Sequence, residues 1–297
     1  MSATIFQEFI QVLSWRRGDE RAPHKPLLLL YALGALSRGQ EFLSYSELEA
    51  PLTELLRDFG PSRARLHPEY PFLRLKNDGI WEIDGFPESE IDSSRSGHNL
   101  TDLRKEAVRG GFRPDIKELF KKFPKLLSKL VQHILDKNFP DTLHDELIER
   151  CGIELRVKYY RHRRNLDFRL AVLEAYKYKC AVCGFSAQSN GRYLALEAAH
   201  IKWHALGGAD SIDNGIALCS LHHKLFDFGA FGIHEGMIVY SENIVGNQEF
   251  DIHFKSFHGK KITIPTNYSH QPLKENIKWH STEVFKYPAR KIKASEG

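Results

Sequence analysis

The sequence predicts an α+β protein with two domains, a mainly helical N-terminal domain and a C-terminal domain in which two strands and a helix surround a metal ion. Three observations lead to this prediction. The chain has 297 residues, which is enough for two domains. Apolar side chains recur at helical spacing along much of the N-terminal half. Three of the four cysteines lie between Cys180 and Cys219, in spacings typical of metal ligands.

The N-terminal domain is expected to span residues 1–152 and to consist mainly of helices. Apolar periodicity predicts these helices near residues 6–13, 27–36, 46–56, 99–138 and 141–150. Short apolar runs flank an Asn-Asp-Gly turn within residues 70–83, so two short strands are expected there. A polar loop, residues 84–98, follows these strands.

A basic linker is expected at residues 153–166. Its run Arg156–Arg164 contains five Lys or Arg residues and no acidic residue. Such a run can neutralise the backbone phosphates of a nucleic acid, and the alternative is a solvated helix face.

The C-terminal domain is expected to span residues 167–297. A helix is predicted over residues 167–176, strands over 192–200 and 215–218, and a further helix over 221–226. Strand, loop, strand and helix in this order, with a metal ion where they cross, form a ββα-metal unit. Residues 240–297 contain no motif of their own.

Composition excludes a membrane protein and favours the cytoplasm. The longest apolar run, Pro26–Leu36, has the length of a core helix and is shorter than the ~18–20 residues of a membrane span. The first residues lack the basic and apolar segments of a signal peptide. Cysteines in metal-type spacing indicate a reducing compartment, so a cytoplasmic protein is expected.

Two short-spaced pairs of residues predict a structural zinc site. Cys180 and Cys183 form one pair, and Cys219 and His222 form the other. A structural Zn²⁺ takes four nitrogen or sulfur ligands in a tetrahedral array, and such pairs usually supply them.

The same stretch contains residues suited to phosphodiester hydrolysis. His200, at the end of a predicted strand, can take a proton from water near neutral pH. The Asn214 amide can hold the loop and orient His200. His223 can bind a catalytic divalent cation such as Mg²⁺ or Mn²⁺, and Asp227 lies one helical turn further on the same face.

His200, Asn214 and His223 resemble the three signature positions of the HNH (ββα-metal) endonucleases, and the four zinc residues resemble the knuckles of one subgroup. The resemblance covers about residues 165–235 and implies a metal-dependent DNA endonuclease. Two positions, Ala199 and His222, depart from the family pattern. Ala199 occupies a position where many members have a metal-binding Asp or His, and Glu197 is expected on the strand face opposite His200. His222 stands where a cysteine is usual, so His222 and His223 could exchange roles.

The N-terminal half resembles the sulfur-binding domain of restriction endonucleases that recognise phosphorothioate-modified DNA. The resemblance rests on the Tyr70-Pro71 pair and on His24, Lys25 and Arg95. It implies an apolar cavity lined by Tyr70 and Pro71, with the other three residues around it. Sulfur is larger and less strongly hydrated than oxygen, so an apolar pocket beside a cation can prefer it. The alternative is a turn in which Tyr70 and Pro71 pack on Trp81.

Together these features predict a type IV, modification-dependent restriction endonuclease. It is expected to bind phosphorothioate-modified double-stranded DNA, to cut it by a one-metal HNH mechanism and to act as a homodimer. Three alternatives remain at this stage: an HNH endonuclease that recognises modified cytosine, a nuclease of low specificity, and a non-catalytic zinc protein that binds DNA.

Overall fold

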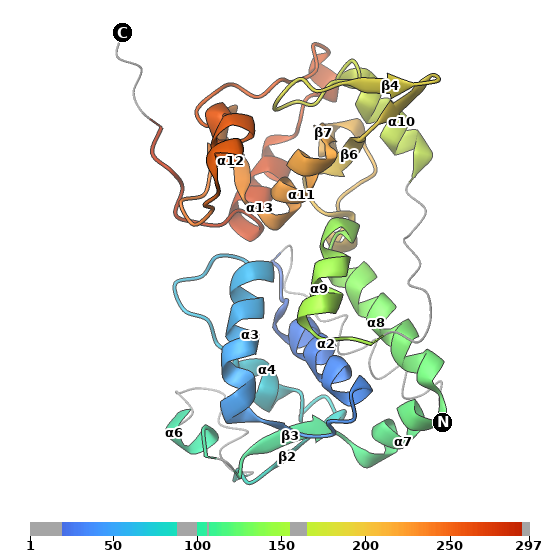
Figure 1. Cartoon of the computed structure of the whole chain (residues 1–297), viewed down its shortest axis with the longest axis vertical. Coiled ribbons are helices and arrows are strands. Elements are labelled where there is room, and N and C mark those ends of the chain that lie inside the picture. The colour runs from blue at the N-terminus through green and yellow to red at the C-terminus, as the bar shows by residue number, and fades with distance from the viewer. Residues whose placement is uncertain (1–19, 88–99, 106, 155–164, 293–297) are drawn as a thin grey trace. The chain divides into compact units, whose positions relative to one another are not determined.

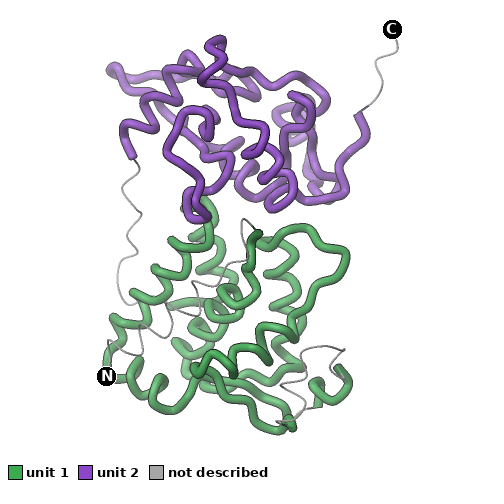
Figure 2. Tube along the Cα trace, turned by 180° about the vertical axis from the view of Figure 1, so that it is seen from behind, with its two compact units in different colours: residues 1–161 green, residues 162–297 purple. Residues whose placement is uncertain are grey.

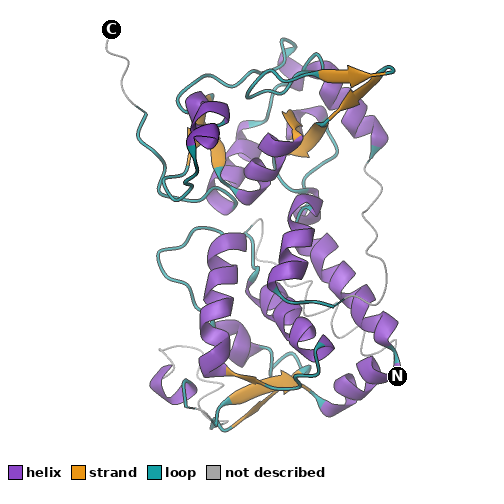
Figure 3. Ribbon diagram, in the orientation of Figure 1, coloured by secondary structure: helices purple, strands orange, loops and turns teal. Residues whose placement is uncertain are grey.

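The computed structural model describes residues 20–87, 100–105, 107–154 and 165–292 (Figure 1). The chain divides into two compact units, residues 1–161 and 162–297 (Figure 2). Helices predominate in the first unit, and small sheets occur in both units, so the predicted α+β class is confirmed (Figure 3). The expected helix at 6–13, the basic run at 156–164 and Arg95 lie outside the described residues.

The core of the first unit is built around helix α2 (His24–Ser37). This helix buries residues on all sides, including the continuous run Leu27–Leu30. A helix that is apolar all round must be surrounded by other elements. Among the described elements, the helices that pack most closely against α2 are α3 (Tyr45–Phe59), α4 (Glu69–Arg74), α8 (Pro124–Asn138) and α9 (His144–Arg150).

A three-stranded antiparallel sheet completes the first unit. Its order is β1 (Leu43–Ser44), β3 (Arg109–Phe112) and β2 (Trp81–Asp84). Gly110 in β3 makes room for a neighbouring indole, because a Cβ there would lie 2.6 Å from Nε1 of Trp81. Short helical elements surround the sheet: α6 (Leu100–Leu103), α7 (Pro114–Lys122) and η1 (Asp141–Leu143).

Two predictions for the first unit were wrong in detail. The first of the two strands expected in residues 70–83 is helix α4. Its Pro71 falls in the first helical turn, where the missing N–H breaks no helical hydrogen bond. The long helix expected over 99–138 is divided into α6, β3, α7 and α8. Two glycines in β3 disfavour a helix there, and α7 and α8 each begin at a proline.

The second unit contains the predicted strand–loop–strand–helix order. Strand β6 (Leu196–His200) pairs antiparallel with β7 (Gly215–Cys219), so that His200 lies opposite Gly215. Helix α11 (Ser220–Phe228) follows directly, and both α11 and α10 (Leu166–Ala175) pack against the hairpin. The strand expected over 192–200 is broken at Ala195, whose φ of 50° interrupts the extended backbone. Residues before the break form β5 (Arg192–Leu194), which pairs with β4 (Ala187–Ser189).

The C-terminal part of the second unit packs around a further hairpin. Its strands are β8 (Phe231–His234) and β9 (Met237–Tyr240), and α13 (Lys274–Glu283) packs on β8. The remaining short elements are η2 (His204–Leu206), η3 (Ile212–Asn214), α12 (Gln248–His253), η4 (Lys255–Phe257) and η5 (Tyr268–His270). Within the described part of the chain, the helices are too short or too polar to cross a lipid bilayer.

Candidate functional site

Four predicted zinc ligands come together in the second unit. The ligand atoms of Cys180, Cys183, Cys219 and His222 all lie within 4.8 Å of one another. Local structure produces this arrangement: Cys219 is the residue before α11, and His222 lies in the first turn of that helix. Among the residues that the structure describes, no other group of three or more His, Cys, Asp or Glu side chains is assembled in this way.

The chemistry of the cluster fits a bound zinc ion. Nδ1 of His222 lies 3.1 Å from Sγ of Cys219 and 3.8 Å from Sγ of Cys180. Zinc ligands at about 2.0–2.3 Å from the metal lie about 3.3–3.8 Å apart in a tetrahedron. Hydrogen bonds from Cys183 and Cys219 hold the pKa of the Cys180 thiol well below its usual range. The cluster therefore favours a thiolate at Cys180, whereas the same contacts raise the pKa of the Cys219 thiol, as expected when neighbouring thiols share a negative charge.

His223 lies between two carboxylates. Its Nδ1 is 2.6 Å from Oε2 of Glu197, and its Nε2 is 3.1 Å from Oδ2 of Asp227. Burial alone would lower the pKa of His223, but the two carboxylates raise it to about 9. Side chains alternate between the two faces of β6, so Glu197 and Ala199 lie on one face and His200 on the other. Glu197 contacts His223 of α11 from its face of the strand. The expectation that Glu197 lies on the face opposite His200 agrees with these contacts.

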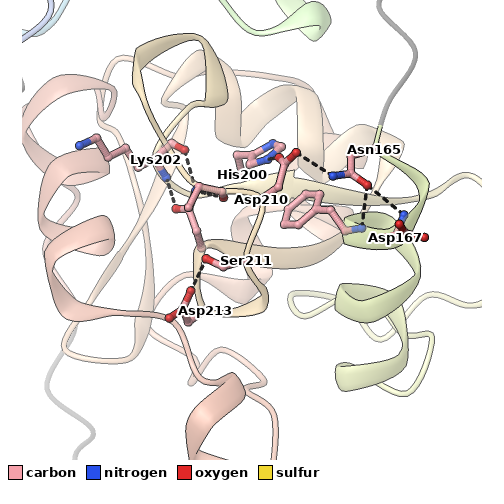
Figure 4. A network of polar contacts seen from close by, with 10 residues as sticks. Asn165, Asp167, His200, Lys202, Asp210, Ser211 and Asp213 are labelled. Atoms are coloured by element: carbon pink, nitrogen blue, oxygen red, sulfur yellow. Dashed lines mark hydrogen bonds and ion pairs between the residues drawn. The ribbon is translucent and has the colours of Figure 1, made fainter.

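His200 lies at the end of β6 and contacts a different set of residues. Its Nε2 is 2.7 Å from Oδ1 of Asp210 (Figure 4). Its ring stacks on Phe168 with 4.2 Å between the ring centroids. The side chain is 24% exposed, so water can reach it. Burial lowers the pKa of His200, and the Asp210 carboxylate opposes this effect. The imidazole is therefore neutral at neutral pH, as a general base must be.

Asn214 holds the loop between β6 and β7. Its side-chain oxygen accepts a hydrogen bond from the backbone N–H of Lys202, and its amide donates to the carbonyls of Lys202 and Ala209. Gly208 allows this close approach, because a Cβ there would lie 2.8 Å from Nδ2 of Asn214. Asn214 does not bond His200 directly. Its backbone carbonyl accepts from the N–H of Ile201, the residue after His200.

In the first unit, Tyr70 lies among cationic and aromatic side chains. Its ring stacks on His67 at 4.3 Å, and the guanidinium of Arg74 lies 4.5 Å from its centroid. Burial lowers the pKa of His24, and the nearby charges of His67 and Arg74 lower it further. The charge effects on His24 arise because the start of α2 lies beside α4, and the two helices pack against each other.

The other predicted sulfur-site residues differ in their surroundings. Pro71 is buried within α4. Lys25 forms an ion pair with Asp78 at 2.5 Å. Arg95 lies outside the described residues.

Sequence reasoning missed several neighbours of these residues. His67 and Arg74 could have been found as basic residues within four positions of Tyr70. Asp210 gave no such signal, because a loop aspartate becomes a partner of His200 only when the loop folds back.

Comparison with known families agrees with both halves of the chain. Residues 2–156 match the family described as ScoMcrA-like, DNA sulfur-binding domain, and residues 180–234 match the HNH endonuclease family HNH_2. Both family resemblances drawn from the sequence are thereby confirmed. The prediction that the chain is a DNA nuclease is confirmed as well. No curated protein matches the sequence.

Solved structures similar to parts of the chain include two sulfur-binding domains complexed with phosphorothioated DNA. The domain of SprMcrA has 21% identity and a TM-score of 0.41, over 52% of this chain and 94% of that one. The domain of ScoMcrA has 19% identity and a TM-score of 0.40, and the match covers 50% of this chain and 94% of that domain. The type IV phosphorothioation-dependent restriction endonuclease ScoMcrA has 20% identity and a TM-score of 0.39, and the match covers 48% of this chain and 32% of that enzyme.

Proposed function

This chain belongs to the ScoMcrA-like DNA sulfur-binding domain family and also carries an HNH endonuclease domain, and from this premise we propose that it is a modification-dependent restriction endonuclease. The first unit binds phosphorothioate-modified double-stranded DNA, and the second unit hydrolyses a phosphodiester bond. The observation that carries the proposal is the joint arrangement of a neutral, partly exposed His200 and the His223–Asp227 pair on one ββα unit.

His200 is the proposed general base, and Asn214 holds the loop that shapes the site. A bound divalent cation would polarise the phosphate and stabilise the leaving oxygen. His223 and Asp227 would hold this cation, which we propose to be Mg²⁺ or Mn²⁺. Their 3.1 Å separation fits two neighbouring ligands, since bonds of about 2.1 Å at right angles put ligand atoms about 3 Å apart. Glu197 would fix the other ring nitrogen of His223, as carboxylates do for many metal-binding histidines.

The proposed structural zinc joins Cys180 and Cys183 to the junction of β7 and α11, through Cys219 and His222. It would hold the start of α11, and so His223, against the hairpin. This division assigns His222 to the zinc and His223 to the catalytic cation. It is supported by the Nδ1 contacts of His222 with cysteine sulfurs and by the carboxylates on both sides of His223.

The sulfur pocket is proposed to involve Tyr70, Pro71, His24 and Lys25, together with Arg95. His67 and Arg74 extend this set, because both contact the Tyr70 ring. An aromatic ring edged by cations suits a group that is negatively charged but more weakly hydrated than an ordinary phosphate.

Matched duplexes with and without one phosphorothioate test the proposed function. Wild-type protein with Mn²⁺ or Mg²⁺ is expected to retain and cut the modified duplex and to leave the plain one intact. The variant H200A is expected to retain the modified duplex without cutting it. Equal treatment of both duplexes would disprove sulfur recognition, and selective cutting of duplexes that carry modified cytosine would establish the alternative reader. Cutting by H200A would disprove its role as base.

The active form is proposed to be a homodimer, since two active sites would cut the two strands of a duplex. The proposed location is the cytoplasm. Light scattering of the protein with modified DNA tests the dimer: a mass of one chain per cleaved duplex would exclude it.

A further inference from the structure

We propose that Asp210 is a positioning residue that selects the tautomer of His200, and that Asn165 holds Asp210 in place for this task. Nothing in the HNH signature assigns a role to either residue. The inference rests on the proposed function, in which His200 is the general base.

The contact between His200 and Asp210 determines where the imidazole proton resides. Oδ1 of Asp210 lies 2.7 Å from Nε2, and an ionised carboxylate can only accept a hydrogen bond. Nε2 must therefore carry the proton, which leaves the lone pair on Nδ1. No hydrogen bond joins Nδ1 to another residue in the described part of the chain. Nδ1 is thus the atom available to a water molecule.

Asn165 has two functions at the start of α10. Its side-chain oxygen caps the helix by accepting hydrogen bonds from the N–H groups of Asp167 and Phe168. Its amide donates to Oδ2 of Asp210 at 2.9 Å (Figure 4). The two oxygens of Asp210 are therefore divided between Asn165 and His200. Burial raises the pKa of Asp210, but these hydrogen bonds outweigh it and leave the pKa below its usual value.

The ring and the loop are also held from other sides. Phe168, three residues after the cap, stacks on the His200 ring with an interplanar angle of 14°. The amide of Asn214 holds the carbonyl of Ala209, the residue before Asp210. Ring plane, ring nitrogen and carboxylate are thus fixed by separate contacts.

The proposed step follows from this arrangement. A water O–H bond breaks and its proton goes to Nδ1 of His200, while the oxygen attacks phosphorus. The bond between phosphorus and the leaving oxygen then breaks, and that oxygen takes a proton from solvent. Asp210 stabilises the resulting imidazolium through Nε2–H and does not itself accept the proton.

The test compares four variants with wild-type protein on phosphorothioate DNA. D210N is expected to lower the cleavage rate about 10- to 100-fold, part of the about 10²–10⁴-fold contribution of a general base. N165D keeps a capping residue but removes the amide donor, and should lower the rate less. D210E is expected to recover part of the loss. D213N alters a carboxylate of the same loop that bonds Ser211, and should leave the rate unchanged.

The pH dependence separates positioning from a general structural role. Burial and His204 lower the pKa of His200, whereas Asp210 and Asp227 raise it. Removing the charge of Asp210 should therefore move the acid limb of the rate profile to lower pH, and N165D, which adds a charge, should move it to higher pH. The proposal would be overturned if D210N had a reduced rate but the acid limb of its pH profile stayed where it is in the wild-type protein. It would also be overturned if D210N cleaved DNA at the wild-type rate.

The tautomer itself can be observed by two-bond ¹H–¹⁵N correlation spectra of histidine-labelled protein. Wild-type His200 should have its proton on Nε2, and D210N should show a mixture of the two tautomers. A wild-type proton on Nδ1 would overturn the proposal. These results are distinct from failure of the proposed function: if H200A cuts DNA, His200 is not the base at all.

Discussion

In the second unit, the candidate zinc ligands and the candidate HNH residues come from one continuous stretch, Cys180–Asp227, whereas the cluster around Tyr70 in the first unit combines the start of α2 with α4. The two units also differ in what holds them together. The first has an apolar helix at its centre, whereas the second packs an apolar core around its hairpins and has in addition a group of three cysteines and one histidine. Residues of the second unit's cluster are close in sequence, so one short segment supplies both the candidate metal ligands and the candidate catalytic residues, whereas helix packing assembles the cluster of the first unit.

The strongest test of this comparison removes a zinc ligand. C180S is expected to eliminate bound zinc and the cooperative unfolding of the second unit, because a structural zinc contributes about 10–16 kcal/mol of apparent binding energy. Modified DNA should still be retained by the first unit. Atomic absorption measures the zinc content, and calorimetry measures the unfolding of the second unit. C151A, which changes the buried cysteine of the first unit, should keep one zinc per chain. Zinc retained in C180S would contradict the assignment.

The reciprocal test weakens the core of the first unit. Leu30 in α2 is fully buried, so L30A should lower the free energy of unfolding by about 2–5 kcal/mol. Denaturant unfolding measures this loss, and zinc content should not change. Loss of zinc together with the first unit would show that the two units do not fold independently.

A smaller change sharpens the comparison within the HNH site. E197Q removes the carboxylate at Nδ1 of His223 and should weaken Mn²⁺ affinity about 10- to 100-fold. Titration of cleavage against Mn²⁺ measures the shift. E249Q is the matched control, since Glu249 also pairs with a histidine but is 70% exposed on α12. Equal affinities in E197Q and E249Q would exclude a role for Glu197 in the metal site.

The smallest expected effect concerns Tyr70. Full burial of an aromatic side chain contributes about 1.5–3 kcal/mol, and Tyr70 is only half-buried, so Y70A should reduce the preference for modified over plain DNA about tenfold. Competition binding measures the preference. Y268A removes a tyrosine that is 88% exposed in the second unit and should leave the preference intact. An unchanged preference in Y70A would remove Tyr70 from the sulfur pocket.

Prediction from sequence worked where spacing along the chain sets spacing in space. Cys219 directly precedes α11 and His222 lies in its first turn, while His223 and Asp227 are four residues apart on this helix, so their proximity follows from helix geometry. The order of strand, loop, strand and helix also follows from local patterns. The helix α4 was missed because a proline-containing apolar segment of six residues is compatible with either structure until its neighbours are known.

The family and the α+β class could be read from the sequence alone, and the sequence also supplied the candidate residues for zinc and for catalysis. Only the tertiary structure decided which carboxylate meets which histidine. Asp210 reaches His200 because Asn214 folds the loop back, and Glu197 reaches His223 because β6 directs alternate side chains to α11. Contacts within a helical turn follow from the spacing of residues along the chain. Contacts across a folded loop form only after the loop has closed, so residue spacing does not predict them.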